Sequence, residues 1–235
     1  MQVPLQALFL DIGNTLLYEE PSRFEIYARS ARDAGIEVAS DVMRGLMVDA
    51  HRELPREIDG HYRYTDGWFD AYIHRIFHEN LGVPVTDLEE LSRELFARFS
   101  DPETFRIFDG ADELFELVDR HDLIFGVISN WSPRLPRILD SLDLSRQFDF
   151  VLSSAIEELE KPDPALFTRA LALAGCDARA AMHAGDHLEK DVAAAERVGI
   201  SAVHVDHEGT SPPAEGVSRV TSLGELATLV ASRIA

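Results

Sequence analysis

The sequence predicts an α/β protein with a doubly wound parallel sheet, and three observations carry this prediction. Apolar runs of strand length recur along the chain, amphipathic helical patterns alternate with them, and one long stretch holds helical patterns alone. Strands that alternate with helices are typical of parallel sheets covered on both faces. We therefore predict a Rossmann-like core of five or more strands at 1–16 plus 106–235, with an α-helical cap domain inserted at 17–105.

Five apolar runs predict the strands of the core. Each run is largely apolar rather than alternating, as expected for strands that are buried on both faces of a sheet. The first run stops at Asp11, where the segment DIGNT begins. The predicted strands are residues 5–10, 123–129, 149–153, 181–185 and 202–205.

Four helical patterns separate or follow these strands. One of them begins with Ser132 and Pro133, a helix-capping residue followed by the usual first helical position. Two others end in glycine, a common helix stop. The predicted helices are residues 109–121, 132–142, 163–175 and 187–199, and the Gly- and Pro-rich residues 207–216 predict a loop.

The stretch from 17 to 105 breaks this alternation. Four amphipathic helical patterns follow one another there, and we find no strand-like run among them. An insert that leaves the sheet after its first strand is expected over the edge where open α/β folds bind ligands. The helical patterns are residues 23–35, 41–54, 67–82 and 86–100.

Composition limits the partners and the compartment. The formal net charge of -20 would repel nucleic acid and anionic membranes, so we predict neither as a partner. No apolar run approaches the ~20 residues of a bilayer span, and the N-terminus lacks a secretory pattern. The single Cys176 excludes an internal disulfide, and together these features predict a cytoplasmic protein. Of the 22 basic residues only Lys161 and Lys190 are lysines, which singles out both.

Polar residues of one chemistry follow the predicted strands. The four segments are DIGNT (11–15), SN (129–130), EKPDP (160–164) and GDHLEKD (185–191). Because the carboxyl ends of parallel strands meet at one edge of a sheet, these carboxylates, hydroxyls and the lysine are expected to converge there. Carboxylate oxygens suit Mg²⁺, and the hydroxyls and the lysine suit phosphate.

On these four segments the chain resembles the haloacid dehalogenase-like hydrolase superfamily over nearly its whole length. The segments occur in the family's order, with a helical cap between the first and the second, as in the small-capped branch. The segment DFVLSSAIEELEKPDPALF, followed by HAGDHLEKDVAAAERVG, is close to the sequence usual in this family. Jointly these motifs are specific, although each alone is weak. The nearest resemblance is to the subgroup named after a rhythmically expressed insect gene, in which glycine occurs near the position of Gly13.

The resemblance implies roles for the catalytic and substrate-binding residues. Asp11 would be the nucleophile and form an aspartyl-phosphate. Lys161 would neutralise the carboxylates and the charge that develops on the phosphoryl group. Thr15, Ser129 and the backbone of Asn130 would bind the substrate phosphate.

The resemblance also implies a magnesium site. Its ligands would be Asp11, the backbone carbonyl of Gly13, and Asp186, with Asp191 as a further ligand or as the group that orients a bound water. Mg²⁺ is therefore the predicted cofactor, and a small phosphorylated molecule is the predicted substrate.

Several of these residues have a simpler interpretation. Lys161 could be an ordinary loop lysine, and Thr15 could bond the backbone of its own turn. His183 and His204 lie inside apolar strands and are expected to be core residues rather than ligands. His187 opens a helix, where it could touch a ligand or lie on the surface.

Gly13 leaves the reaction open. Most phosphatases of the superfamily carry aspartate there, which donates and accepts the proton in catalysis, a contribution of ~10²–10⁴-fold. A cap histidine, His187 or water could take over that duty in a phosphatase. Dehalogenases and carbon–phosphorus hydrolases also lack the aspartate, but the dehalogenases lack the acid at Asp186, and residues 17–105 hold no lysine for an imine. A non-catalytic protein that binds a phosphorylated ligand or a partner is the remaining alternative.

We conclude from the sequence that the chain is a magnesium-dependent hydrolase, most simply a phosphomonoesterase acting on a small metabolite as a monomer or homodimer. Because Gly13 cannot protonate a leaving group, we hypothesise that esters with good leaving groups are favoured over alkyl phosphates.

Overall fold

The computed structural model describes residues 3–212 and 214–234, which form two compact units. The first, which we call the core unit, contains the chain up to Tyr18, Ile107–Trp131 and the chain from Leu135 onward. The second, the helical unit, contains Glu19–Arg106 together with Ser132–Arg134. Each unit is described by itself.

The core unit is built on a six-stranded sheet in the order β10-β9-β8-β1-β6-β7, in which every neighbouring pair is parallel. This confirms the predicted α/β fold class. The five predicted strands are present, and a short sixth strand, β10, was not foreseen because two of its three residues are exposed. The strands are β1 (Ala7–Leu10), β6 (Ile124–Ser129), β7 (Phe150–Ser153), β8 (Ala181–Gly185), β9 (Ser201–Val205) and β10 (Ser218–Val220).

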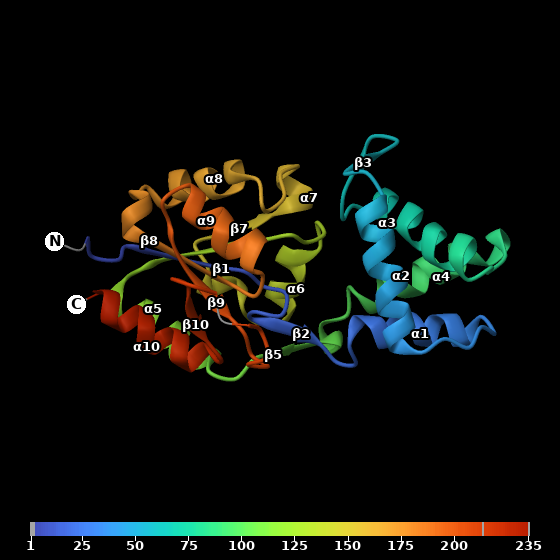
Figure 1. The fold of residues 1–235 in the computed structure, drawn as a ribbon, viewed down its shortest axis with the longest axis horizontal. Coiled ribbons are helices and arrows are strands. Elements are labelled where there is room, and N and C mark those ends of the chain that lie inside the picture. Colours follow the sequence, from blue (N-terminus) through green and yellow to red (C-terminus); the bar gives the residue numbers. More distant parts are fainter. Residues whose placement is uncertain (1–2, 213, 235) are drawn as a thin grey trace. The chain divides into compact units, whose positions relative to one another are not determined.

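Helices cover both faces of this sheet: α8 and α9 lie on one face, and α5 and α10 on the other (Figure 1). Helix α8 begins at Pro164, where the Asp163 side chain accepts a hydrogen bond from the backbone of Ala165, and it ends at Gly175 with φ of 63°. The helices are α5 (Ala111–His121), α6 (Leu135–Ser141), η4 (Ser145–Gln147), α7 (Ser154–Glu157), α8 (Pro164–Ala174), η5 (Ala178–Ala180), η6 (Leu188–Ala193), α9 (Ala194–Arg197) and α10 (Leu223–Ile234).

Two of the predicted core helices differ in detail from the structure. The helix predicted from Ser132 begins only at Leu135, and the Ser132 hydroxyl instead accepts a hydrogen bond from the Arg134 backbone in the preceding turn. The helix predicted for 187–199 starts as one π-helical segment, η6, and continues as α9. π-helical segments are rare and are often found at functional sites.

The strand order reverses at β1. The chain leaves β1 for β6 and β7 on one side, and it returns to β8 on the other side of β1. Leu10 at the end of β1 lies opposite Val127 in β6 and Ala184 in β8, so the carboxyl ends of these three strands are adjacent. Such a switch point is where open α/β sheets bind their ligands.

The helical unit has its own apolar core, centred on the fully buried Trp68 and Phe77 and on Tyr27. Aromatic contacts are frequent in it, and Trp68 stacks on Tyr72 with ring centroids 5.3 Å apart. The helices are α1 (Arg23–Asp33), α2 (Ser40–Glu53), α3 (Asp66–Ile73), the π-helical η1 (His74–Asn80), η2 (Val85–Asp87), α4 (Leu88–Arg98) and η3 (Pro102–Thr104).

The expectation of no strands between 17 and 105 is wrong. Strands β2 (Leu17–Glu19) and β5 (Phe105–Ile107) pair with each other, and β3 (Glu57–Ile58) forms a hairpin with β4 (His61–Tyr62). The hairpin turns at Asp59 and Gly60, with φ of 50° and 80°. Two-residue strands are too short for an alternating pattern, but Asp-Gly is a strong hairpin signal that could have revealed them.

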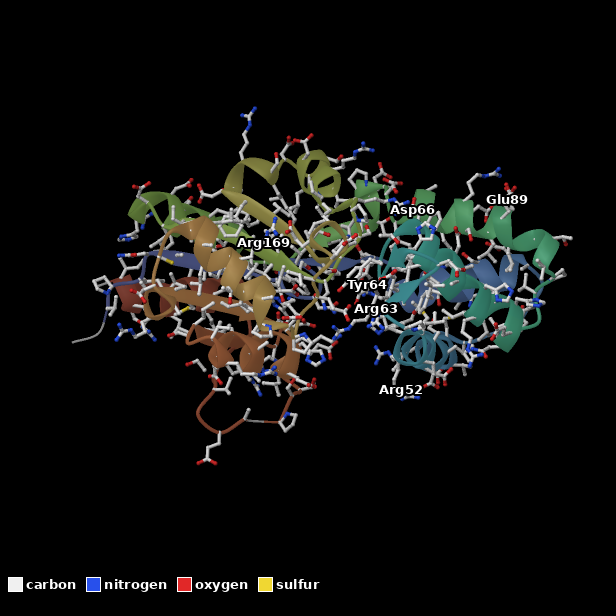
Figure 2. The ribbon with its side chains drawn as sticks, turned by 90° about the horizontal axis from the view of Figure 1, so that it is seen from above. Arg52, Arg63, Tyr64, Asp66, Glu89 and Arg169 are labelled. Carbon is white, nitrogen blue, oxygen red and sulfur yellow. The ribbon has the colours of Figure 1, made fainter. Side chains whose placement is uncertain are left out.

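The segment after β4 is packed within the helical unit. The Arg63 guanidinium donates to the Leu54 carbonyl at 2.9 Å and lies over the Trp68 ring, and the Tyr64 hydroxyl lies 2.9 Å from His51 Nε2. Figure 2 labels Arg63 and Tyr64 in this segment, and Arg52 and Glu89 among the exposed charged side chains of the unit. None of the helices in the described part of the chain has the length and apolarity needed to cross a membrane.

Candidate active site

Asp11 follows β1 directly and is 5% exposed. Its Oδ1 accepts hydrogen bonds from Ser129 Oγ at 2.9 Å and from Lys161 Nζ at 2.7 Å. Its Oδ2 accepts one from Thr15 Oγ1 at 3.3 Å. Three groups predicted from separate segments of the sequence are therefore gathered on one carboxylate.

The loop after Asp11 folds back on itself and supports this carboxylate. The backbone N–H groups of Thr15, Leu16 and Leu17 all point at the Ile12 carbonyl, at 3.3, 2.9 and 2.8 Å. Thr15 is fully buried, and its hydroxyl donates to the Asp11 side chain rather than to the backbone of its own turn. Gly13 brings no side chain to this loop, and its backbone forms a β-bridge with Leu17.

A histidine from outside the loop holds it in place. His207 Nε2 lies 2.9 Å from the Thr15 carbonyl, and its ring stacks on Phe108 with centroids 3.6 Å apart. The Phe108 backbone N–H donates to the Leu16 carbonyl at 3.0 Å. The loop that carries Gly13 is thus anchored from two other parts of the core unit.

Lys161 is 3% exposed and lies between two carboxylates, with its Nζ 2.7 Å from Asp11 Oδ1 and 2.5 Å from Asp191 Oδ1. Burial opposes the charged ammonium, but Asp11 and Asp191 outweigh it and raise the pKa of Lys161 above its usual value. A loop lysine in solvent would show neither the burial nor the two partners, so that alternative is wrong.

The Asn130 side chain serves Lys161 rather than the open site. Its Nδ2 donates to the Lys161 carbonyl at 2.9 Å, and its Oδ1 accepts from the Lys161 backbone N–H at 2.8 Å. This two-way clamp fixes the loop that delivers the ammonium. The role of the Asn130 backbone toward substrate stays a prediction.

Asp186 and Asp191 complete the site from the end of β8 and from η6. Ligand atoms of Asp11, Asp186 and Asp191 all lie within 4.8 Å of one another. Burial, reinforced by the charges of Asp11 and Asp191, raises the pKa of Asp186 to about 7. Burial also acts on Asp191, but Lys161 and His183 outweigh it and hold the pKa of that carboxyl below its usual range. The site thus carries more negative charge than the single ammonium balances.

Gly185 makes room for Asp191. A Cβ at Gly185 would lie 2.3 Å from Asp191 Cγ and 2.7 Å from Asp191 Oδ1, distances that real Cβ atoms do not show. The absence of a side chain at the end of β8 therefore lets the Asp191 carboxylate approach the sheet edge.

Gly185→Ala is expected to displace Asp191, to cost ~1–3 kcal/mol of stability from overpacking, and to lower the catalytic turnover of the site as well. Gly126→Ala is the matched control, because its Cβ would lie 2.2 Å from the Phe150 ring in the same sheet. Thermal unfolding should detect a loss in both variants, whereas turnover should fall only for Gly185→Ala. Equal activity of the two variants would contradict the role given to Gly185.

Three histidines lie near these acids, and the structure adds contacts that the sequence did not predict. His183 and His204 are core residues as expected, 0% and 3% exposed, yet His183 Nε2 lies 2.9 Å from Asp191 Oδ1 and His204 Nε2 lies 3.0 Å from the Asp186 carbonyl. His187 Nδ1 accepts hydrogen bonds from the backbone of the first turn of η6, and its own backbone N–H donates to Asp191 Oδ2 at 3.1 Å. Sequence reasoning missed the contact of His183 with the site.

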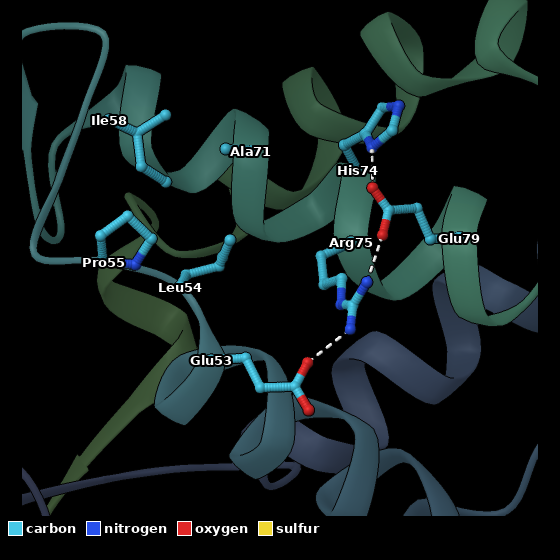
Figure 3. A pocket seen from close by; sticks show the side chains of 8 residues that line it. All are labelled: Glu53, Leu54, Pro55, Ile58, Ala71, His74, Arg75 and Glu79. Carbon is cyan, nitrogen blue, oxygen red and sulfur yellow. Dashed lines mark hydrogen bonds and ion pairs between the residues drawn. The ribbon is translucent and has the colours of Figure 1, made fainter.

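The helical unit holds a separate pocket of about 500 Å³, shown in Figure 3. Its wall combines apolar side chains with an ion-pair chain in which Arg75 bridges Glu53 and Glu79, and His74 Nδ1 lies 3.3 Å from Glu79. None of the catalytic candidates lines it. The lining residues are Glu53, Leu54, Pro55, Ile58, Ala71, His74, Arg75 and Glu79.

The chain is similar to known proteins in sequence and in fold. The human haloacid dehalogenase-like hydrolase domain-containing protein 3 is 30% identical over 85% of this chain and 81% of its own length. The phosphoserine phosphatase of Thermus thermophilus is 29% identical over 94% of this chain and 96% of its own length. The crystal structure of a HAD phosphatase from Thermococcus onnurineus has the same fold, with a TM-score of 0.68 at 20% identity, covering 98% of this chain and 100% of that one.

The family model for haloacid dehalogenase-like hydrolases matches residues 5–199, a range that contains all four motif segments and every residue gathered around Asp11 except His204 and His207. The chain therefore belongs to the haloacid dehalogenase-like hydrolase family.

Proposed function

We propose that this protein is a magnesium-dependent phosphatase that hydrolyses a small phosphorylated metabolite through an aspartyl-phosphate on Asp11. The observation that carries the proposal is the buried Asp11 carboxylate, which Ser129 and Lys161 contact at 2.9 and 2.7 Å. A carboxylate beside a fixed ammonium and a hydroxyl is suited to attack phosphorus, because both donors can stabilise the charge on the phosphoryl oxygens.

The proposed reaction has two displacements at phosphorus. An oxygen of Asp11 attacks the phosphorus, and the bond to the ester oxygen breaks with its electron pair. Water then attacks the aspartyl-phosphate, the bond to Asp11 breaks, and inorganic phosphate is released with Asp11 restored. Lys161 and Ser129 stabilise the phosphoryl oxygens in both displacements, and Thr15 keeps the Asp11 carboxylate oriented.

The donor set fits Mg²⁺. Asp11 and Asp186 provide hard carboxylate oxygens, and the Gly13 carbonyl follows Asp11 by two residues. Burial, reinforced by the charges of Asp11 and Asp191, raises the pKa of Asp186, and a dication beside these carboxylates would favour their charged forms. Both Asp191 oxygens already accept hydrogen bonds, so its proposed part is to stand beside the metal and orient its surroundings. When bound, Mg²⁺ would act as a Lewis acid on the phosphoryl oxygens.

We also propose that the chain belongs to the small-helical-cap branch and to the subgroup with glycine at the second position of the first motif. A helical unit inserted between β1 and β6 and the residue Gly13 support this. We further propose that the protein is located in the cytoplasm, that it is a monomer or homodimer, and that neither nucleic acid nor a membrane is its partner.

The proposal is tested with a panel of aryl and alkyl phosphate esters, assayed with Mg²⁺ and with EDTA. We expect turnover only with Mg²⁺ and a larger kcat/KM for aryl esters, because Gly13 offers no acid to protonate an alkoxide. Gly13→Asp should narrow this gap by raising the alkyl rates. Equal aryl and alkyl rates would refute the leaving-group hypothesis, and metal binding with no turnover of any ester would favour a ligand-binding protein.

A further inference from the structure

His183 is an unusual residue for its position. It lies in β8 within an apolar cluster, is 0% exposed, and packs edge-on against Phe167 with ring centroids 5.1 Å apart. An apolar side chain would fill the same space without bringing two polar nitrogens into the core. Burial of such a group costs free energy unless it is hydrogen-bonded, so its contacts indicate what it does.

One ring nitrogen meets the active site and the other does not. His183 Nε2 lies 2.9 Å from Asp191 Oδ1, whereas Nδ1 is buried and has no hydrogen-bond partner among the described residues. A proton on Nδ1 would be a buried donor without an acceptor. The geometry therefore assigns the neutral ring with its proton on Nε2, donated to Asp191.

The contact between His183 and Asp191 depends on the lack of a side chain at Gly185. Residues 183 and 185 point to the same face of β8, since side chains alternate along a strand. Gly185 leaves the space that Asp191 fills, and His183 reaches the same carboxylate from within the core. The backbone N–H of His187 holds the other oxygen of Asp191 at 3.1 Å.

Asp191 in turn holds the catalytic lysine. Its Oδ1 accepts from both His183 and Lys161, and Lys161 Nζ also contacts Asp11. The side chains form a continuous path from His183 through Asp191 and Lys161 to Asp11. Without the His183 donor, the Asp191 carboxylate could rotate, and the ammonium would lose its fixed position.

We propose that His183 is a positioning residue of the phosphatase site, whose Nε2–H orients Asp191 and thereby fixes Lys161 against Asp11. This inference rests on the proposed function, because Lys161 acts on a phosphoryl group there. Removal of such an outer hydrogen bond typically lowers activity by ~10–100-fold.

The test compares His183→Leu with His183→Gln. Leucine fills the space without a donor, whereas the glutamine amide can present an N–H near the position of Nε2. Glutamine also buries a carbonyl oxygen, so packing alone would make it no more stable than leucine. We expect kcat/KM to fall ~10–100-fold in His183→Leu and only a few-fold in His183→Gln, even where its thermal stability is lower. Phe167→Leu, which removes the ring packed on His183, should lose stability with little loss of activity.

A second readout needs no turnover. In protein labelled with ¹⁵N-histidine, the spectrum of His183 should show a protonated Nε2 and an unprotonated Nδ1. A proton on Nδ1, or equal activity loss in the leucine and glutamine variants, would overturn the role of His183. Failure of the covalent mechanism would appear instead as wild-type turnover that persists in Asp11→Asn, so the two proposals fail by different results.

Discussion

Asp11→Asn is expected to lower kcat at least ~10⁴-fold for every ester that the wild type hydrolyses, because the amide cannot form the covalent phospho-enzyme. The substitution keeps the shape of the side chain. With its amide oxygen at the position of Oδ1 it still accepts from Ser129, whereas the amide nitrogen at the position of Oδ2 cannot accept from Thr15. Substrate binding should be retained more fully than turnover, and rapid acid quenching should trap a phosphoryl adduct on the wild type alone.

The control for this substitution must separate chemistry from folding. Asp112→Asn makes the same chemical change on the exposed first turn of α5 and should leave kcat unchanged. Asp11→Asn removes one of three clustered carboxylates, so its melting temperature in EDTA is not expected to fall far below that of the wild type. Turnover by Asp11→Asn within ten-fold of the wild type would exclude Asp11 as the nucleophile.

The fold was predictable where apolar content alone decides it. Parallel strands buried on both faces read as largely apolar runs, and the five predicted runs became β1, β6, β7, β8 and β9. The edge strand β10 and the hairpin β3–β4 were not predicted, because backbone pairing and not burial of apolar residues makes them strands. For the hairpin the Asp59-Gly60 turn was a readable signal, but for β10 the sequence Ser-Arg-Val offered none.

The site was predictable as a set of residues but not as a network. Residues at strand ends converge for topological reasons, so Asp11, Ser129 and Lys161 could be expected together. The hydrogen-bond partner of each polar atom depends on the packing of side chains, which the spacing of residues in the sequence does not reveal. That Asn130 clamps the Lys161 backbone and that a core histidine reaches Asp191 follow from loop geometry and from the space at Gly185.

Lys161→Met is expected to damage stability and catalysis together, because it removes the one ammonium found among three carboxylates of the described site. Loss of one partner from a buried ion pair costs ~3–5 kcal/mol, since the remaining charges lie buried and uncompensated. Loss of a donor to the phosphoryl oxygens should lower kcat by a further ~10²–10³-fold. Chemical denaturation and steady-state kinetics measure the two effects separately.

Lys190→Met is the matched control, because it makes the same change at the only other lysine of the sequence. Lys190 is only partly buried, and its loss should change stability by less than ~0.5 kcal/mol. Lys161→Arg should not rescue catalysis, because a planar guanidinium does not fit a position that is 3% exposed and shared by two carboxylates.

The effect of Mg²⁺ on the melting temperature separates lost charge compensation from lost packing in Lys161→Met. If the harm in Lys161→Met comes from uncompensated carboxylates, Mg²⁺ should raise its melting temperature by more than it raises that of the wild type. A variant harmed only by a cavity would gain no more than the wild type does. An equal gain in the two proteins would therefore place the cost of losing Lys161 in packing. Its ion pairs with Asp11 and Asp191 would then no longer explain why a chain whose basic residues are almost all arginines has a lysine there.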